Sequence, residues 1–165
     1  MLYKKQLTKE QAHQKAKHYC AYQERCHAEV KEKLYSFGLR KQQVEEVLSQ
    51  LIEENCLNEE RFALQFAGGK FRMKQWGRIK IKYELKQKQV SDYCIKKALD
   101  SIEEAHYQKV LQQQASKKWK SIKGVGVNKY VRISKTTTWL LQRGFESNLI
   151  RNAVNKLNEE TASLN

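Results

Sequence analysis

One apolar pattern occurs three times along this chain and limits its fold more than any other feature. Each copy begins with a leucine, has a second apolar residue five positions later, and ends with four apolar residues at the i, i+3, i+4 and i+7 spacing of one helix face. The copies are Leu34, Leu39, Val44, Val47, Leu48 and Leu51; Leu85, Val90, Ile95, Ala98, Leu99 and Ile102; and Leu140, Phe145, Ile150, Ala153, Val154 and Leu157. A shared period of about 50 residues is typical of repeat architectures. The alternative is three unrelated helical hairpins that agree by chance.

Residues that end or begin helices occur at matching places. Gly38 and Gly144 each precede the second apolar residue of a copy, where glycine suits a left-handed C-terminal helix cap. Gln89 occupies this place in the middle copy, at some cost in backbone energy. Thr8, with Gln11 three residues later, predicts a capping box at the start of the first helix.

The composition favours helices throughout. The 165 residues include no proline, and a hydrophobic content of 40% suits small stacked units better than one large core. We therefore predict an all-α protein, built from three tandem three-helix repeats that form an elongated, curved array. The predicted segments are repeat one over residues 8–55, repeat two over 56–102, repeat three over 103–158, and a frayed tail over 159–165.

Two further features bear on local structure and location. Gly68-Gly69 is expected to loosen the first helix of the second repeat. No stretch approaches the roughly 18 apolar residues of a membrane span, and the N-terminal residues lack the apolar region of a secretory signal. We expect a cytoplasmic protein without membrane contact.

The net charge of +14 is concentrated in one part of the chain. Residues 68–90 carry eight basic groups and one acidic group, so half of the excess lies in this run. Such a block indicates an anionic partner, which is nucleic acid, an acidic protein groove or a nucleoprotein; a solvated face that only keeps the protein soluble is the alternative. The candidate binding residues are Lys70, Arg72, Lys74, Arg78, Lys80, Lys82, Lys86 and Lys88.

Other kinds of site have weak support. The histidines and cysteines that lie closest together match no standard zinc spacing, and ordinary helix positions explain them better. They are His13, His18, Cys20, Cys26 and His27. Gly124-x-Gly126 followed by Lys129 lacks the Gly-Lys-Ser/Thr ending of a phosphate loop. No nucleophile motif or paired-carboxylate motif is visible. We expect no catalytic residue, no metal and no cofactor.

Two motifs lie in the second repeat, one from Leu57 to Ala63 and one from Gly77 to Val90. Together, in this order, they resemble motifs of the RecX family, regulatory proteins that modulate the RecA recombinase. The segment from Leu57 to Ala63, LNEERFA, is similar to the family's Leu-Asn-Asp-x-x-Phe-Ala signature. The segment from Gly77 to Val90 is similar to its glycine-to-Glu-Leu-x-x-Lys-Gly-Ile signature, with Gln89 in place of the cap glycine. The resemblance extends over roughly residues 10–157, and the threefold repetition of three-helix units matches the family fold.

The resemblance implies a function. A family member would be expected to lodge in the groove of a RecA–DNA filament as a monomer, and to hinder ATP hydrolysis and strand exchange in DNA repair, recombination and the SOS response. It would bind DNA itself only weakly and non-specifically. The alternative is a stand-alone DNA-binding protein or transcription regulator, because three-helix units resemble helix-turn-helix modules.

Ile79 and Tyr83 depart from the family pattern, which generally has polar or charged residues there. On a helical wheel they point about 160° away from the core residues Ile81 and Leu85. Such an apolar pair needs cover, either from a neighbouring repeat or from a partner.

Overall fold

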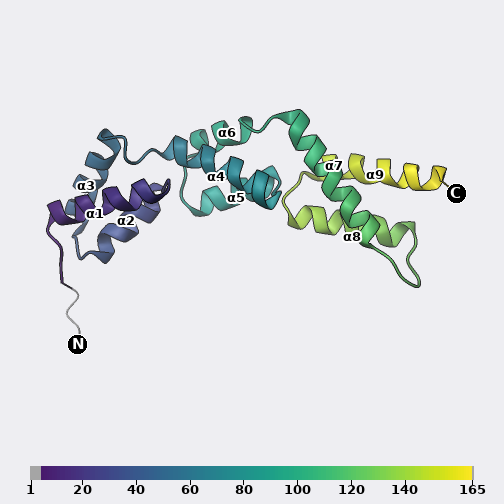
Figure 1. Cartoon of the computed structure of the whole chain (residues 1–165), viewed down its shortest axis with the longest axis horizontal. Helices are drawn as coiled ribbons and strands as arrows, with labels where there is room; N and C mark the ends of the chain where they lie inside the picture. The colour runs from purple at the N-terminus through teal and green to yellow at the C-terminus, as the bar shows by residue number, and fades with distance from the viewer. Residues whose placement is uncertain (1–4, 165) are drawn as a thin grey trace. The chain divides into compact units, whose positions relative to one another are not determined.

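The computed structural model describes residues 5–164, and over that range its regular elements are all α-helices (Figure 1). These are α1 (Lys9–Tyr22), α2 (His27–Ser36), α3 (Lys41–Glu53), α4 (Glu59–Lys74), α5 (Arg78–Gln87), α6 (Asp92–Asp100), α7 (Glu104–Ser121), α8 (Lys129–Gln142) and α9 (Ser147–Ser163). The predicted all-α fold is confirmed. The capping box is also confirmed, because Gln11 N–H donates to the Thr8 hydroxyl and Thr8 N–H donates to the Gln11 side chain.

The repeated apolar pattern forms the interior. All of its members are buried except Leu99, which is half-buried. The four residues at helical spacing lie on α3, α6 and α9, or just beyond the end of α6 in the case of Ile102. Burial of this one face stabilises the helices more than their intrinsic propensity does, because isolated helices of this length are marginal in water.

In the second and third copies, the leucine and the apolar residue five positions later enclose a Schellman turn. In the third copy, Phe145 N–H donates to the Leu140 carbonyl at 3.3 Å, which is the 6→1 bond of this motif. Gly38 and Gly144 have φ angles of 87°, and Gln89 adopts the same left-handed region at 60°. The apolar pair is therefore the hydrophobic contact that accompanies such a cap.

The described residues form two compact units, and each is presented by itself. The first contains the residues up to Phe66 together with Glu84–Ala98, and the second contains Ala67–Tyr83 together with the residues from Leu99 onward. Helices α4 and α5 therefore each contribute to both units, so the units do not coincide with the predicted repeats. The repeat limits near residues 55 and 102 stay a prediction.

In the first unit, α1, α2 and α3 pack against one another around a buried cluster. Its members are Ala12, Ala16, Cys20, Val30, Leu34, Leu39, Val44, Val47, Leu48, Leu51 and Leu57. Two ion pairs connect the rest of the unit to these three helices. Arg61 on α4 pairs with Glu24, and Lys88 pairs with Glu29 on α2 at 3.2 Å. Burial raises the pKa of the Cys20 thiol to about 11, so this side chain stays a neutral, apolar part of the core.

In the second unit, Tyr107 on α7 lies at the centre of the packing. It is fully buried, and its ring centroid lies 5.7 Å from that of Phe71 and 5.6 Å from that of Phe145. Its hydroxyl accepts a hydrogen bond from Arg78 N–H at 3.0 Å and donates one to Glu146 at 2.8 Å. One buried phenol therefore ties the first residue of α5 to the residue that precedes α9.

Two glycines let the start of α5 approach the turn between α8 and α9 closely. Gly77 N–H donates to the Arg143 carbonyl at 2.7 Å, and Ile79 N–H donates to the Gly144 carbonyl at 2.9 Å. The first N–H groups of a helix have no partner inside the helix. Here the α8–α9 turn supplies their acceptors, and it thereby fixes where α5 begins.

Two local predictions are wrong. Helix α4 runs through Gly68-Gly69 without interruption, since the buried neighbours Ala67 and Phe71 outweigh a glycine cost of about 1 kcal/mol each. Helix α9 does not fray after Asn158 but continues to Ser163. Trp119 on α7 donates its indole N–H to the Thr161 hydroxyl at 3.2 Å, and this contact holds the last turns.

Candidate partner-binding surface

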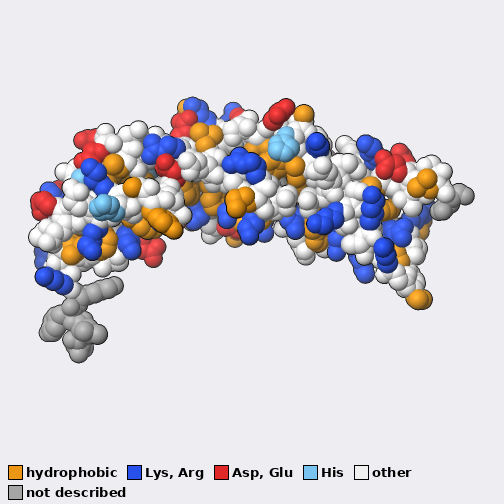
Figure 2. Space-filling view, viewed as in Figure 1, with side chains coloured by type: hydrophobic (Ala, Val, Ile, Leu, Met, Phe, Trp, Pro, Cys, Tyr) orange, Lys and Arg blue, Asp and Glu red, His pale blue; other side chains and the backbone are white. Residues whose placement is uncertain are grey.

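The eight basic residues predicted from the sequence lie on the second half of α4 and on α5 and the residue after it. They fall into two groups by exposure. Arg72, Lys74, Lys82 and Lys86 are exposed, whereas Lys70, Arg78, Lys80 and Lys88 are half-buried. Figure 2 shows Lys and Arg side chains scattered over the visible face with hydrophobic side chains between them.

Arg78 serves the second unit's own structure. Its guanidinium pairs with Glu104 and lies 3.7 Å from Glu146. It also lies 3.7 Å from the centre of the Tyr107 ring, a cation–π geometry. A hydrogen bond from Gln108 and the one from Arg78 lower the pKa of the Glu104 carboxyl, so the acidic partner stays ionised. Arg78 is therefore committed to internal contacts.

Lys88 has a comparable internal role in the first unit. Its ammonium group pairs with Glu29 at 3.2 Å and lies 5.8 Å from the centre of the Phe66 ring. Burial opposes ionisation of Glu29, but hydrogen bonds from the Cys26 backbone and from Lys88 outweigh it and lower the pKa of this carboxyl. Among the predicted residues, the remaining six are the better candidates for contact with a partner.

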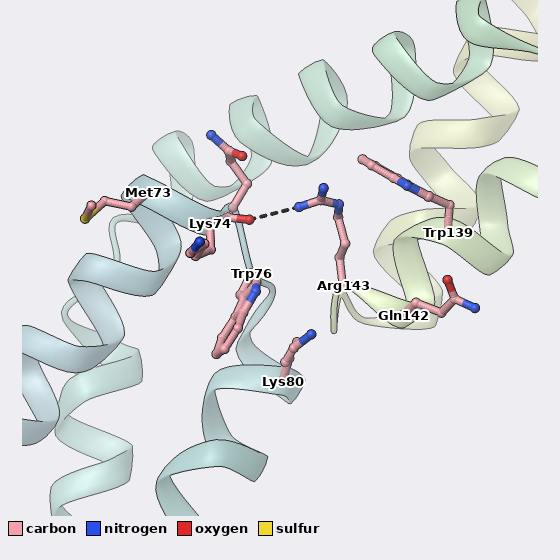
Figure 3. Close-up of a pocket in the computed structure, with 8 residues that line it drawn as sticks. Met73, Lys74, Trp76, Lys80, Trp139, Gln142 and Arg143 are labelled. Atoms are coloured by element: carbon pink, nitrogen blue, oxygen red, sulfur yellow. Dashed lines mark hydrogen bonds between the residues drawn. The ribbon is translucent and has the colours of Figure 1, made fainter.

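A pocket of about 460 Å³ opens in the second unit beside these residues (Figure 3). Its lining residues are Met73, Lys74, Gln75, Trp76, Lys80, Trp139, Gln142 and Arg143. Lys74, Lys80 and Arg143 supply three positive charges, and no carboxylate of the described residues belongs to the lining. The pocket therefore combines two indole rings with an excess of positive charge.

Lysine and arginine side chains make cation–π contacts with both tryptophan rings. Lys80 and Lys70 lie 4.6 Å and 5.0 Å from the centre of the Trp76 ring. Arg143 lies 4.2 Å from the centre of the Trp139 ring, and Figure 3 shows its side chain between the two indoles. Such contacts place the positive charges at the ring faces.

Arg143 holds the pocket together. Its guanidinium donates to the carbonyl of Lys74 at 2.9 Å, at the C-terminal end of α4. Its own carbonyl accepts from Gly77 N–H. A cation at a helix C-terminus is favourable because the last carbonyl groups lack partners and carry partial negative charge. Two hydrogen bonds of Arg143, one from its side chain and one to its carbonyl, therefore connect the chain segment around Trp76 to the end of α8, which carries Trp139.

Sequence reasoning missed the contribution of Trp139 and Arg143. The cap glycine Gly144, directly after Arg143, is the nearest signal in the sequence, but it indicates only the end of a helix. What brings this turn to Trp76 is the contact between Gly77 and Gly144, 67 positions apart, and no local pattern encodes it.

Apolar side chains also lie on the outward side of α5. Ile79 is 53% exposed and Tyr83 is 60% exposed, and Met73 near the end of α4 is 79% exposed. The predicted orientation of Ile79 and Tyr83 away from the core is thus confirmed. Both side chains stay largely exposed in the second unit, and cover by a partner stays a prediction.

The groups considered for metal or nucleotide binding are arranged differently. Within residues 5–164, no three His, Cys, Asp or Glu side chains gather in a way that would hold a metal ion. His13 lies 3.1 Å from Glu54, and Cys26 is the residue before α2. Gly124 and Gly126 lie in the irregular segment between α7 and α8. Their φ angles are 129° and 78°. No helix in the described range is long and apolar enough to cross a bilayer.

Comparison with known proteins gives consistent results. Two family models match, the second three-helix domain of RecX over residues 58–99 and the third over residues 106–154. The regulatory protein RecX of Prosthecochloris aestuarii is 32% identical over 139 residues, which cover 84% of this chain and 88% of that protein. The regulatory protein RecX of Clostridium tetani is 30% identical over 129 residues, which cover 78% of this chain but 59% of that protein.

A solved structure has the same arrangement of helices. The crystal structure of RecX from Lactobacillus salivarius superimposes with a TM-score of 0.80 at 22% identity, covering 91% of this chain and 96% of that one. At such low identity the likeness concerns the fold alone. It confirms the prediction of an array of helical repeats.

Proposed function

This chain belongs to the RecX family of regulatory proteins, and from that premise we propose that it binds the RecA–DNA filament and inhibits ATP hydrolysis and strand exchange. It acts as a monomer in the cytoplasm, by binding and not by catalysis, in DNA recombination, repair and the SOS response. Family membership is the observation that carries this proposal. The surface of α4 and α5 supplies the physical argument for where the filament is contacted.

Helix α5 has the chemistry that a nucleoprotein surface requires. Lys82 and Lys86 are exposed on it, and Lys80 lies over the Trp76 ring. Exposed lysines of this kind attract phosphates and acidic side chains and release counterions when they bind. Ile79 and Tyr83 add apolar area among the charges. Interfaces typically combine apolar or aromatic anchors with a polar, charged surround.

Direct binding of DNA is a weaker part of the same proposal. The basic groups supply non-specific attraction to phosphates, and no distinct base-reading motif is visible in the sequence. Binding to free DNA should therefore be weak and insensitive to sequence. The filament, whose groove would contact the apolar as well as the basic side chains, should be bound more tightly.

The test compares three targets for a fluorescently labelled protein at one salt concentration: a preformed RecA filament on single-stranded DNA, the same DNA alone, and RecA alone. Tightest binding to the filament supports the proposal. Equal affinity for naked DNA and filament would instead favour a stand-alone DNA-binding protein. The double variant Ile79→Ser/Tyr83→Ser should weaken filament binding without a change in helicity, because both side chains are exposed.

A further inference from the structure

The pocket between Trp76 and Trp139 has a composition that electrostatic attraction alone does not explain. A non-specific phosphate contact needs only exposed cations, and Lys82 and Lys86 already supply these. The pocket adds two half-buried indole rings and two amide side chains, Gln75 and Gln142.

We propose that this pocket binds an unpaired base of single-stranded nucleic acid, with the flanking phosphates on Lys74 and Lys80. The base stacks within the group formed by Trp139, Arg143 and Trp76. This inference deepens the DNA binding proposed above and rests on it, because it assigns that binding to a defined site and to single strands.

The geometry of the aromatic groups supports stacking. The Arg143 guanidinium lies 4.2 Å from the Trp139 ring centre and is held there by its bond to the Lys74 carbonyl. Planar guanidinium groups and indoles both stack on bases, and the energy of such stacking depends little on which base is present. A site that is fixed before binding loses less entropy when the base enters.

The charges support a nucleic acid as the occupant. Lys74 is exposed at the edge of the pocket, and Lys80 and Lys70 lie within 5.0 Å of the Trp76 ring centre. Proteins that bind single strands without sequence preference combine such a positive track with aromatic stacking platforms. A duplex keeps its bases stacked inside, so it cannot place one in the pocket without paying for extrusion.

An acidic protein segment is the competing occupant. It would match the positive charge, but it would not require two indole rings and two amide side chains in the same pocket. The experiment therefore separates the contribution of the bases from that of the charge.

Fluorescence anisotropy of the whole 165-residue chain provides the test, with a short oligothymidylate and an abasic oligomer of the same length and phosphate number. The wild type should bind oligothymidylate about tenfold more tightly, since stacking contributes about that much per base. Trp139→Ala should remove this preference. Tyr130→Ala is the matched control, because Tyr130 is also an aromatic residue of α8 next to a lysine, at 5.1 Å, but lies outside the pocket.

Each result has one reading. Equal affinity of the wild type for the two oligomers overturns the inference and needs no variant, so a Trp139→Ala protein that unfolds does not block the test. A preference that survives in folded Trp139→Ala also overturns it. Displacement of oligothymidylate by polyglutamate of equal charge at equal concentration would assign the pocket to an acidic protein segment. Filament binding is measured separately, so a failure here leaves the proposed regulatory function standing.

Discussion

Gly77 packs directly against the backbone of Gly144: a Cβ atom on Gly77 would lie 2.2 Å from the Gly144 carbonyl oxygen. A Cβ on Gly144 would in turn lie 2.2 Å from the Cβ of Lys80. The two chain segments touch at a distance that excludes any side chain, and α5 begins at this contact. The pocket and the first lysines of α5 depend on it for their position.

The first prediction follows from this contact. Gly77→Ala should force the two backbones apart and lower the free energy of unfolding by about 1–3 kcal/mol, the usual range for overpacking. Urea unfolding checks this value. Gly69→Ala is the control, because Gly69 lies within α4 and a Cβ there would meet nothing within 4 Å. It should stabilise the protein by roughly 0.5–1 kcal/mol. Equal effects of both substitutions would show that the Gly77 contact is looser than described.

The second prediction concerns Gln89, where a substitution should raise the stability of the protein. Its φ of 60° lies in the left-handed region, where the other two repeats have Gly38 and Gly144. Gln89→Gly should relieve this strain and raise the melting temperature, by an amount that corresponds to up to about 1 kcal/mol. A lower melting temperature would mean that the Gln89 side chain makes contacts worth more than the strain.

The third prediction concerns the buried phenol. Tyr107→Phe leaves Arg78 N–H and the Glu146 carboxylate without their shared partner, which should cost about 1–3 kcal/mol. Burial raises the pKa of the Tyr107 hydroxyl, so the folded state favours the neutral phenol. This stabilising contribution is complete below the unfolded pKa of about 10 and is lost as the pH rises above it. The stability difference between wild type and Tyr107→Phe should therefore shrink at alkaline pH.

The control for that experiment is Tyr22→Phe, since Tyr22 is 84% exposed. It should change stability little at any pH, as surface substitutions usually do. If the free energies of unfolding of the wild type and Tyr107→Phe differ by the same amount at neutral and alkaline pH, the pKa of the Tyr107 hydroxyl does not change on unfolding, and the prediction is wrong.

The fourth prediction concerns direct DNA binding. Contacts to phosphates should make the affinity fall with salt, with a log–log slope of roughly −0.7 to −0.9 for each phosphate neutralised. A titration of labelled single-stranded DNA at several salt concentrations gives this slope. An affinity that barely changes between low and moderate salt would contradict the electrostatic account.

Much of the fold could be predicted because its signals are local. The apolar spacing from Val44 to Leu51 specifies a buried helix face by itself, and Thr8 and Gln11 specify a cap by themselves. Gly68 and Gly69 misled the prediction because propensity is a weak signal where neighbours such as Ala67 are buried.

The candidate site could be predicted only in part. The run of lysines and arginines on α4 and α5 is visible in the sequence, but the commitment of Arg78 to internal contacts is not. Its partners Tyr107 and Glu146 are 29 and 68 positions away along the chain and come close only through packing. Trp139 joins Trp76 for the same reason, through a turn that the Gly77–Gly144 contact fixes.

The steady-state ATPase of RecA on single-stranded DNA tests the proposed inhibition of the RecA filament through the lysines of α5. The proteins to compare are the wild type, the variant Lys80→Ala/Lys82→Ala/Lys86→Ala, and the charge-matched control Lys5→Ala/Lys15→Ala/Lys41→Ala, whose three lysines are exposed in the first unit. Wild type and control should inhibit at substoichiometric amounts, whereas the α5 variant should inhibit poorly although its helicity and melting temperature stay near wild type. If the folded α5 variant inhibits as strongly as the wild type at matched salt, the interface lies elsewhere and this account is contradicted. If the wild type leaves the ATPase unchanged, the proposed function itself is contradicted.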